Sequence, residues 1–303
     1  MTEPDNKHLV LIVSAGRTGT RFFGDLLASM IPGSYSVHEP DVLDGFTWRT
    51  VEAIRTFGFR HMLVDRALGR SGLRNLSTAF LSGELNQDEV AKIIYDQRSR
   101  YYNKISSDLI IESNYQWFGI LPVAPKLFPK FKMVAISRDP RSWVTSCMNF
   151  GRLYGPRDFV SRFGFKRLNP GMIDDAPYKD QWPRMSSFER LCWTWAAINR
   201  ILLDYLDGRD NARLWRYEDL FLSGNREAAL RDMLEFITTF PDAKFSFELN
   251  PDLLTERRHA SGRKHFPDWP AWPDDHKTRL YEICGPMMKA LGYESGPEKI
   301  PTP

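Results

Sequence analysis

The chain has few cysteines and no recognisable metal-binding cluster. Its 303 residues include three cysteines, Cys147, Cys192 and Cys284, and each lies in an apolar stretch with a helical pattern. An odd number in such surroundings favours buried free thiols over a disulfide framework. The six histidines form no HExxH or similar motif, and the cysteines lack the spacing of metal ligands. We therefore expect neither disulfides nor a bound metal ion.

Long apolar runs and an excess of charge are also missing. No run of 18 apolar residues occurs, and the first residues, MTEPDNKH, are polar and acidic where a signal peptide would be basic and then apolar. We expect no membrane span and a cytoplasmic location. The 41 Lys and Arg residues nearly balance 38 Asp and Glu residues, and the net charge of +3 does not indicate a nucleic-acid partner. Any anion site must therefore be local.

The composition is that of an ordinary globular protein, with 42% hydrophobic and 26% charged residues. A chain of this length buries a sizeable core, and we expect a single domain over residues 1–303. Short β-prone apolar runs predict strands at residues 9–13, 34–38, 109–111, 131–137 and 212–217. Helical patterns occur at residues 22–30, 86–105, 187–205, 227–239 and 274–291. This alternation predicts an α/β fold.

The stretch after the first predicted strand is the strongest sign of a ligand site. Gly16 and Gly19 bracket Arg17 and Thr18, between a strand that stops at Ser14 and a helix. A helix that begins in such a loop points free N–H groups and its positive dipole end into the turn, where a phosphate or sulfate binds. The alternative is a turn that only reverses the chain. The signatures GxxxxGK[ST] and GxGxxG are absent, so this is a phosphate loop without an ATPase signature.

Polar residues also follow the other predicted strands, at the edge where parallel sheets bind ligands. His38 and Glu39 end the second strand, residues 112–114 follow the third, and Arg138 follows the fourth. Neighbouring side chains along a strand point to opposite faces, so we expect only one of His38 and Glu39 to face the crevice.

Residues 150–183 form the main irregular stretch, rich in Gly, Pro, aromatic and basic residues. Long loops of this kind are commonly lids or binding loops, and disorder is the alternative. We expect a lid here. Its basic and aromatic character suggests that it closes over a large or anionic ligand, which is the acceptor if the protein transfers a group.

Two stretches, SAGRTGTRFF (residues 14–23) and SRDPRSWVTS (residues 137–146), resemble the sulfotransferases that use 3′-phosphoadenosine 5′-phosphosulfate (PAPS). The resemblance extends from residue 9 to about residue 292. It implies one three-layer domain of P-loop type, in which helices flank a central, mainly parallel sheet. It also implies that the first loop binds the 5′-phosphosulfate, through Arg17, Thr18, Gly19, Thr20 and Arg21.

The resemblance implies the rest of the donor site as well. In the family, an Arg at a strand end and a Ser on the next helix hold the 3′-phosphate, and Arg138 and Ser146 match with the family's spacing of eight residues. Tyr217 begins a YEDL segment whose Tyr lies beside the adenine. The sequence SGRKHFP resembles the late phosphate-binding loop of the heparan-sulfate type enzymes, which would add Gly262, Arg263 and Lys264.

Departures from the family pattern indicate its carbohydrate-modifying branch. Arg17 stands where many members have Lys, Arg21 follows Thr20, and the His-Leu-Pro segment of the phenol-modifying branch is missing. Glu39 lies 22 residues after Arg17, where the carbohydrate-modifying branch has its catalytic Glu. The resemblance therefore implies Glu39 as the general base, with His38 as the second candidate and Arg17 as the catalytic cation.

The implied activity is transfer of a sulfuryl group from PAPS to a hydroxyl or amine of a small-molecule, glycan or glycolipid acceptor, without a metal. One alternative is a P-loop kinase acting on a small molecule, which needs Mg²⁺ and a carboxylate. Among the strand ends at Ser14, Glu112 and Ser137-Arg138, only Glu112 offers an acid. Another alternative is a nucleotide-binding protein without catalysis. The sequence leaves the acceptor's identity and the oligomeric state open.

Overall fold

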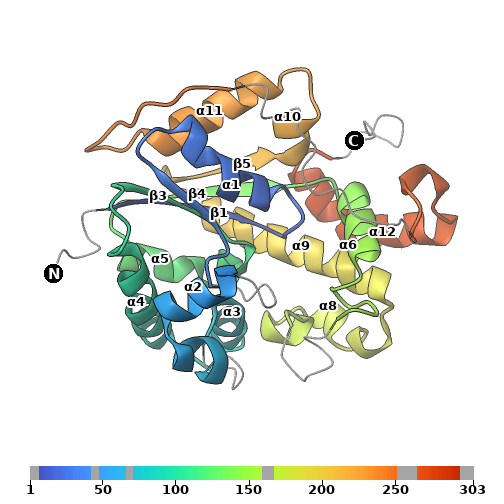
Figure 1. The fold of residues 1–303 in the computed structure, drawn as a ribbon. Helices are drawn as coiled ribbons and strands as arrows, with labels where there is room; N and C mark the ends of the chain where they lie inside the picture. The colour runs from blue at the N-terminus through green and yellow to red at the C-terminus, as the bar shows by residue number, and fades with distance from the viewer. Residues whose placement is uncertain (1–6, 42–47, 66–70, 159–166, 251–264, 294–303) are drawn as a thin grey trace.

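The computed structural model describes residues 7–41, 48–65, 71–158, 167–250 and 265–293, and these build a central sheet with helices on both faces (Figure 1). The strands are β1 (His8–Ser14), β2 (Tyr35–His38), β3 (Leu109–Ser113), β4 (Phe131–Ser137) and β5 (Ala212–Arg216). They are paired in the order β2-β3-β1-β4-β5, and every pairing is parallel. The predicted α/β class with a parallel sheet is confirmed.

Helices separate the strands along the chain. Their bounds are α1 (Thr20–Met30), α2 (Trp48–Phe57), α3 (Leu73–Leu81), α4 (Gln87–Tyr102), α5 (Ala124–Leu127), α6 (Pro140–Phe150), α8 (Ala176–Lys179), α9 (Ser187–Leu206), α10 (Tyr217–Phe221), α11 (Arg226–Thr238) and α12 (Asp274–Ala290). Shorter helical turns are η2 (Arg60–Asp65), η3 (Tyr115–Val123), η4 (Pro170–Met172), η5 (Trp182–Arg184) and η7 (Trp269–Ala271). None of the helices within the described residues is long and apolar enough to cross a membrane.

The sheet is buried on both faces, as a parallel sheet requires. Every residue of β1 is buried, and its alternate side chains enter two different cores. Val10 and Ile12 pack with residues of α1 and α11, whereas Leu9, Leu11 and Val13 pack with α4, α6, α9 and α12. Figure 1 shows these two helical layers on opposite sides of the sheet.

Local sequence signals set several helix ends. Asn86 and Glu89 form a capping box that begins α4, and Ser186 and Glu189 form one that begins α9. Pro140 occupies the first turn of α6, where the missing N–H is not needed. The three cysteines are free and buried, as predicted.

The irregular stretch at residues 150–183 is partly described. Residues 159–166 lie outside the described residues, and the remainder contains η4, α8 and η5. The ring of Trp182 packs 5.0 Å from that of Trp193 on α9, and Arg167 forms an ion pair with Asp158. The Trp182–Trp193 contact holds the later part of the stretch against α9, whereas the ion pair joins two parts of the stretch to each other. Its role as a lid stays a prediction.

Candidate active site

The loop after β1 has the backbone of a tight anion-binding turn. Gly16, Arg17 and Gly19 have φ of 79°, 56° and 78°, in the left-handed region. Ser14 Oγ accepts hydrogen bonds from the Gly16 N–H at 2.9 Å and from the Thr18 hydroxyl at 2.7 Å, which tightens the loop. Helix α1 begins directly afterwards at Thr20, so its first N–H groups point into the turn.

Gly19 is required at its position for two reasons. Its φ is positive, and a Cβ there would lie 3.0 Å from the Phe221 ring. The Tyr217 ring packs 4.8 Å from Phe221, and Phe221 packs 5.1 Å from Phe22 on α1. The loop is therefore flanked by an aromatic surface. Tyr217 itself, expected at a strand end, begins the short helix α10.

The Arg17 side chain reaches across to α6. Its Nε donates a hydrogen bond to Ser146 Oγ at 3.2 Å, and its guanidinium lies 4.5 Å from the centre of the Phe150 ring. Burial lowers the pKa of Arg17, and the nearby charge of Arg138 also lowers it. The cation is therefore less favourable here than in water, and an anion bound at this point would stabilise it.

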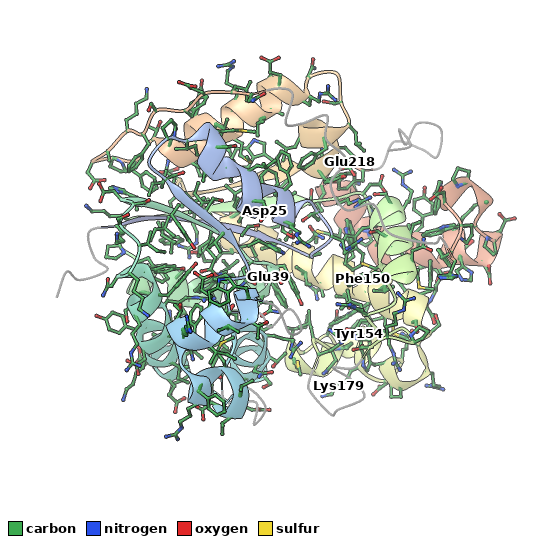
Figure 2. The ribbon with its side chains drawn as sticks, viewed as in Figure 1. Asp25, Glu39, Phe150, Tyr154, Lys179 and Glu218 are labelled. Atoms are coloured by element: carbon green, nitrogen blue, oxygen red, sulfur yellow. The ribbon has the colours of Figure 1, made fainter. Side chains whose placement is uncertain are left out.

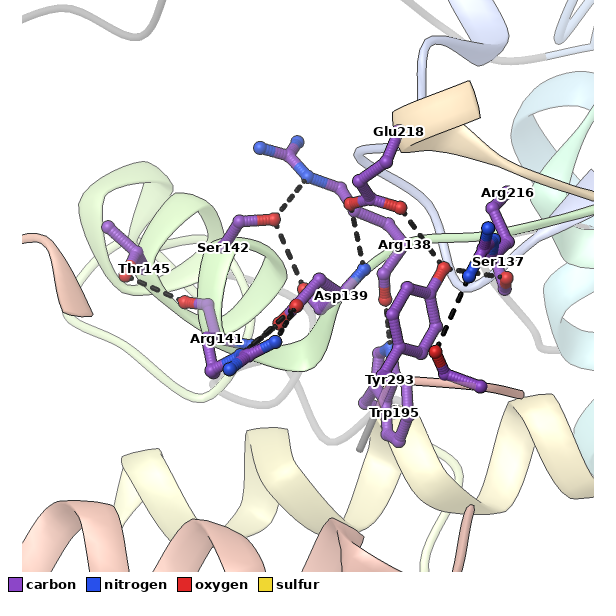
Figure 3. A network of polar contacts seen from close by, with 11 residues as sticks. Ser137, Arg138, Asp139, Arg141, Ser142, Thr145, Trp195, Arg216, Glu218 and Tyr293 are labelled. Atoms are coloured by element: carbon purple, nitrogen blue, oxygen red, sulfur yellow. Dashed lines mark hydrogen bonds and ion pairs between the residues drawn. The ribbon is translucent and has the colours of Figure 1, made fainter. Parts of the chain in front are cut away.

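Arg138 approaches the same loop from the end of β4. Its Nη1 donates to the Arg17 carbonyl at 2.8 Å, its Nε donates to Ser142 Oγ at 2.9 Å, and its guanidinium lies 4.5 Å from the centre of the Tyr217 ring (Figure 3 shows the surrounding network). The structure thus brings together four residues that are far apart in the sequence: Arg17, Arg138, Ser146 and Tyr217.

The turn that carries Arg138 is held by residues that the sequence did not indicate. The Arg138 carbonyl accepts from Trp195 Nε1 at 2.8 Å, and Glu218 Oε1 accepts from the Asp139 N–H at 3.0 Å. The Tyr293 hydroxyl bridges Ser137 Oγ at 2.9 Å and Glu218 Oε2 at 3.1 Å (Figure 3). On the other side, the buried Trp143 donates its Nε1–H to the Gly16 carbonyl at 2.7 Å. These bonds fix the loop and the turn relative to each other.

Glu218 makes the stability of this network depend on pH. Burial raises the pKa of Glu218 above its ordinary value of 4.5. The folded state therefore keeps the proton at pH values where the unfolded state has lost it, so stability decreases as pH rises above that ordinary value. Glutamine cannot lose a proton, yet it still accepts from the Asp139 N–H. We expect the melting temperature of Glu218→Gln, relative to the wild type, to increase with pH over this window, measured by thermal unfolding without ligand. Parallel curves for the two proteins would contradict this assignment.

His38 and Glu39 lie together at the end of β2, and Glu39 is labelled in Figure 2. The strand ends at His38, and Glu39 has a φ of 44°. His38 Nε2 and Glu39 Oε1 are 3.9 Å apart, and the two side chains are 21% and 18% exposed. The expectation that strand alternation would point them to opposite faces is wrong, because Glu39 has already left the strand.

Tyr115 begins η3 and packs against the loop after β1. A Cβ on Gly16 would lie 3.7 Å from the Tyr115 ring, so the ring packs against the loop. Burial raises the pKa of Tyr115, and the negative charge of Glu39 raises it further. Tyr115 was not among the predicted site residues, and the one signal that could have found it is its position two residues after the end of β3.

Residues 112–114 were crevice candidates by position, and this interpretation is corrected. Glu112 belongs to β3 and is fully buried, bonded to Arg98, Tyr102 and Trp117 at 2.6–3.0 Å. Ser113 Oγ donates to the Thr20 carbonyl at 2.7 Å, and Asn114 Oδ1 accepts from the backbone N–H two residues on. These side chains support the fold beneath the site.

Four further residues were predicted to bind the donor. One of them lies on an exposed helix face, and three lie outside the residues that the structure describes. Arg21 lies on the exposed side of α1, with its Nε 3.6 Å from Asp25 Oδ2. Gly262, Arg263 and Lys264 lie outside the described residues. The chain that follows them is hydrogen-bonded to the site helix, because the N–H groups of residues 265 and 266 donate to Asn149 Oδ1 on α6.

No family model matches the sequence, and no curated protein is significantly similar to it. Several solved structures are similar in fold. The sulfotransferase domain from the curacin biosynthetic pathway is 16% identical over 93% of this chain and 98% of its own, with a TM-score of 0.48. The sulfotransferase domain of the Synechococcus PCC 7002 olefin synthase is 16% identical over 92% of this chain and 96% of its own, with a TM-score of 0.45.

A sulfotransferase from Alicyclobacillus acidocaldarius is 17% identical over 93% of this chain and 96% of its own, with a TM-score of 0.38. All three proteins are described as sulfotransferases or sulfotransferase domains. At these identities and TM-scores, the similarity is one of fold only and assigns no role to any residue.

Proposed function

We propose that this protein is a sulfotransferase that uses PAPS as donor and a hydroxyl or amine of a second molecule as acceptor. The observation that carries the proposal is the meeting of Arg17, Arg138 and Ser146 at a left-handed loop and a helix N-terminus. The positive charge of Arg138 is near enough to lower the pKa of Arg17, so an anion bound between the two cations would be stabilised by both. The site therefore suits a ligand with more than one anionic group.

The donor fits the residues that are present. Arg17, Thr18, Gly19 and Thr20 would hold its 5′-phosphosulfate, through the loop N–H groups and the Arg17 cation. Arg138 and Ser146 would hold the 3′-phosphate. The aromatic surface formed by Tyr217 and Phe221 offers a face to the adenine. Arg21, Gly262, Arg263 and Lys264 remain proposed donor ligands on the resemblance alone.

The chemistry divides between two residues of this chain. PAPS supplies the sulfuryl group. Arg17 stabilises the negative charge that grows toward the 5′-phosphate as transfer proceeds, because it is already positioned there. Glu39 accepts the proton that the acceptor hydroxyl or amine loses, with His38 as the second candidate for this role.

The kinase alternative is weaker than the sulfotransferase proposal. It requires a carboxylate that holds Mg²⁺ at this edge of the sheet. Glu112, the acid that the sequence offered, is buried and bonded to Arg98, Tyr102 and Trp117. We expect PAP, the desulfated product, to stabilise the protein in thermal unfolding by about 2.7 kcal/mol at 100 times its Kd. ATP with Mg²⁺ at the same concentration should stabilise the protein much less. The reverse order would favour the kinase.

A binding protein without catalysis would pass the thermal test, so a second measurement is needed. We propose a small-molecule, glycan or glycolipid acceptor, with residues 150–183 closing over it. Labelled sulfate from PAPS, offered to a panel of such acceptors, should appear in at least one product. Saturable PAP binding with no transfer to any acceptor, and no PAPS hydrolysis, would favour the binding protein.

Arg138→Ala tests the 3′-phosphate assignment. A bond to a charged group contributes about 1.5–3 kcal/mol, so we expect PAP affinity to fall by about tenfold or more. Adenosine 5′-phosphate lacks the 3′-phosphate, so its affinity should change much less. Calorimetric titration of both nucleotides measures the difference. Arg213→Ala is the control. Arg213 lies on β5, and its half-exposed side chain pairs with Asp232 on α11, so this variant should bind both nucleotides as the wild type does. An unchanged preference in Arg138→Ala would refute the assignment.

A further inference from the structure

A buried charge cluster lies beneath the segment that carries the proposed base. It contains Arg98 on α4, Asp41 and Glu112, and each is at most 1% exposed. Arg98 Nη2 lies 3.2 Å from Asp41 Oδ1 and 2.9 Å from Glu112 Oε1. The Arg98 guanidinium is also stacked near aromatic rings, 5.3 Å from the centre of Phe57. Two carboxylates thus share one cation inside the protein.

One of these carboxylates is close to the proposed base in the sequence. Asp41 follows Glu39 by two residues, with Pro40 between them, and we call residues 38–41 the base segment. The segment is bonded at both ends. The Ser113 carbonyl accepts from the Glu39 N–H at 3.1 Å and lies 3.1 Å from His38 Nδ1. At the other end, Asp41 is paired with Arg98.

The backbone of the base segment needs such support. Glu39 has a φ of 44°, a conformation that residues with a side chain seldom adopt, and it persists only where the surroundings enforce it. Pro40 has its own φ fixed by its ring, so a displacement of Asp41 is transmitted to Glu39. A buried ion pair seldom stabilises a protein more than apolar packing would. We therefore infer that the Arg98–Asp41 pair serves to position the base segment.

We propose that Arg98 and Asp41 are positioning residues for the proposed general base. Arg98 holds Asp41 in the interior, and the rigid Glu39-Pro40-Asp41 sequence then fixes the Glu39 carboxylate at the edge of the sheet. This inference rests on the proposed function, because it concerns the base of that reaction. Arg98 and Asp41 are both buried, so we infer that they act on the reaction through Glu39 and not by contact with a substrate.

Asp41→Asn and Glu112→Gln form a matched pair of variants. Each removes one carboxylate from the same guanidinium, but only Asp41 belongs to the base segment. We expect Asp41→Asn to lower kcat about tenfold to 10²-fold, because small misplacements of a reacting group have effects of this size. Its PAP affinity should stay within about twofold of the wild type. Glu112→Gln should keep kcat within about twofold of the wild-type value, because the Arg98–Asp41 pair remains.

Hydrogen exchange gives a second readout that does not depend on activity. The peptide that contains residues 35–41 should exchange faster in Asp41→Asn than in the wild type or Glu112→Gln. If Asp41→Asn does not fold, Arg98→Lys replaces it, because it keeps the charge and loses the planar fork. Equal losses of kcat in the two matched variants, or unchanged exchange of this peptide, would overturn the proposal.

Glu39→Gln, measured in parallel, separates the two possible failures. If it keeps full activity, Glu39 is not the base and the positioning role falls with it. If Glu39→Gln is inactive while Asp41→Asn has wild-type kcat, the proposed function stands and only the positioning role is rejected.

Discussion

Replacing Glu39 by glutamine is expected to lower kcat by about 10²–10⁴-fold, the usual effect of removing a general base. Glutamine has the same size and shape as glutamate, so the positive φ of residue 39 and its bond to the Ser113 carbonyl are kept. Only the ability to accept a proton is lost. The residues that we propose to bind the donor PAPS lie on other elements, so the affinity for PAP should remain within a few-fold of the wild-type value. Transfer of labelled sulfate and calorimetric titration with PAP measure the two quantities.

His38 must be tested beside it, because its Nε2 lies only 3.9 Å from the Glu39 carboxylate. His38→Gln removes the imidazole and keeps a side chain that can bond to the Ser113 carbonyl. If Glu39→Gln keeps more than about a tenth of the wild-type kcat while His38→Gln loses it, the proton goes to His38. The assignment to the carbohydrate-modifying branch would then weaken too.

The central strands β1 and β4 were predictable because they are apolar on both faces. A parallel sheet covered by helices admits few polar residues, so runs such as residues 131–137 are visible in the sequence without knowledge of their partners. The third strand was predicted too short, because Glu112 and Ser113 are polar. Both are buried and both belong to β3. Their partners come from α1 and α4, and no local pattern indicates such distant contacts.

The backbone at Glu39 explains a different kind of failure. Strand alternation predicted that His38 and Glu39 diverge, but the strand ends between them and Glu39 turns into the left-handed region. That turn depends on the Ser113 carbonyl, which lies on the neighbouring strand. The direction of a side chain one residue beyond a strand therefore depends on tertiary contacts. The alternation of side chains along the strand does not predict it.

Residues that support the site were missed for a similar reason. Trp143, Trp195 and Tyr293 each donate or bridge a hydrogen bond to the loop or the turn that carries Arg138. In the sequence they appear as apolar positions of helices or of the chain near its end, because nothing local shows where an indole N–H or a phenol O–H is directed. The loop glycines and Arg17 were predicted from the local strand-loop-helix pattern, and Arg138 and Ser146 were predicted from the family spacing.

Arg17→Ala is expected to lower kcat by about 10²-fold or more, and to weaken PAP binding by a smaller factor. The guanidinium lies 4.5 Å from the centre of the Phe150 ring and is bonded to Ser146, so it is already positioned before reaction. A cation fixed in this way stabilises the charge that develops on the leaving phosphate more than it stabilises the bound ground state. Measured kcat and KM for PAPS, with the Kd of PAP, give the two contributions separately.

Arg17→Lys is the matched variant, because alanine and lysine both have a Cβ and so meet the same strain at a φ of 56°. Lysine keeps the positive charge and loses the planar guanidinium and its fork of donors. If charge is what the reaction requires, Arg17→Lys should keep kcat within about tenfold of the wild type while Arg17→Ala does not. A change confined to KM in Arg17→Ala would show that Arg17 only binds the donor. Equal losses of kcat in both variants would assign the effect to the guanidinium fork and its bond to Ser146, because both variants lose these and only Arg17→Lys keeps the charge.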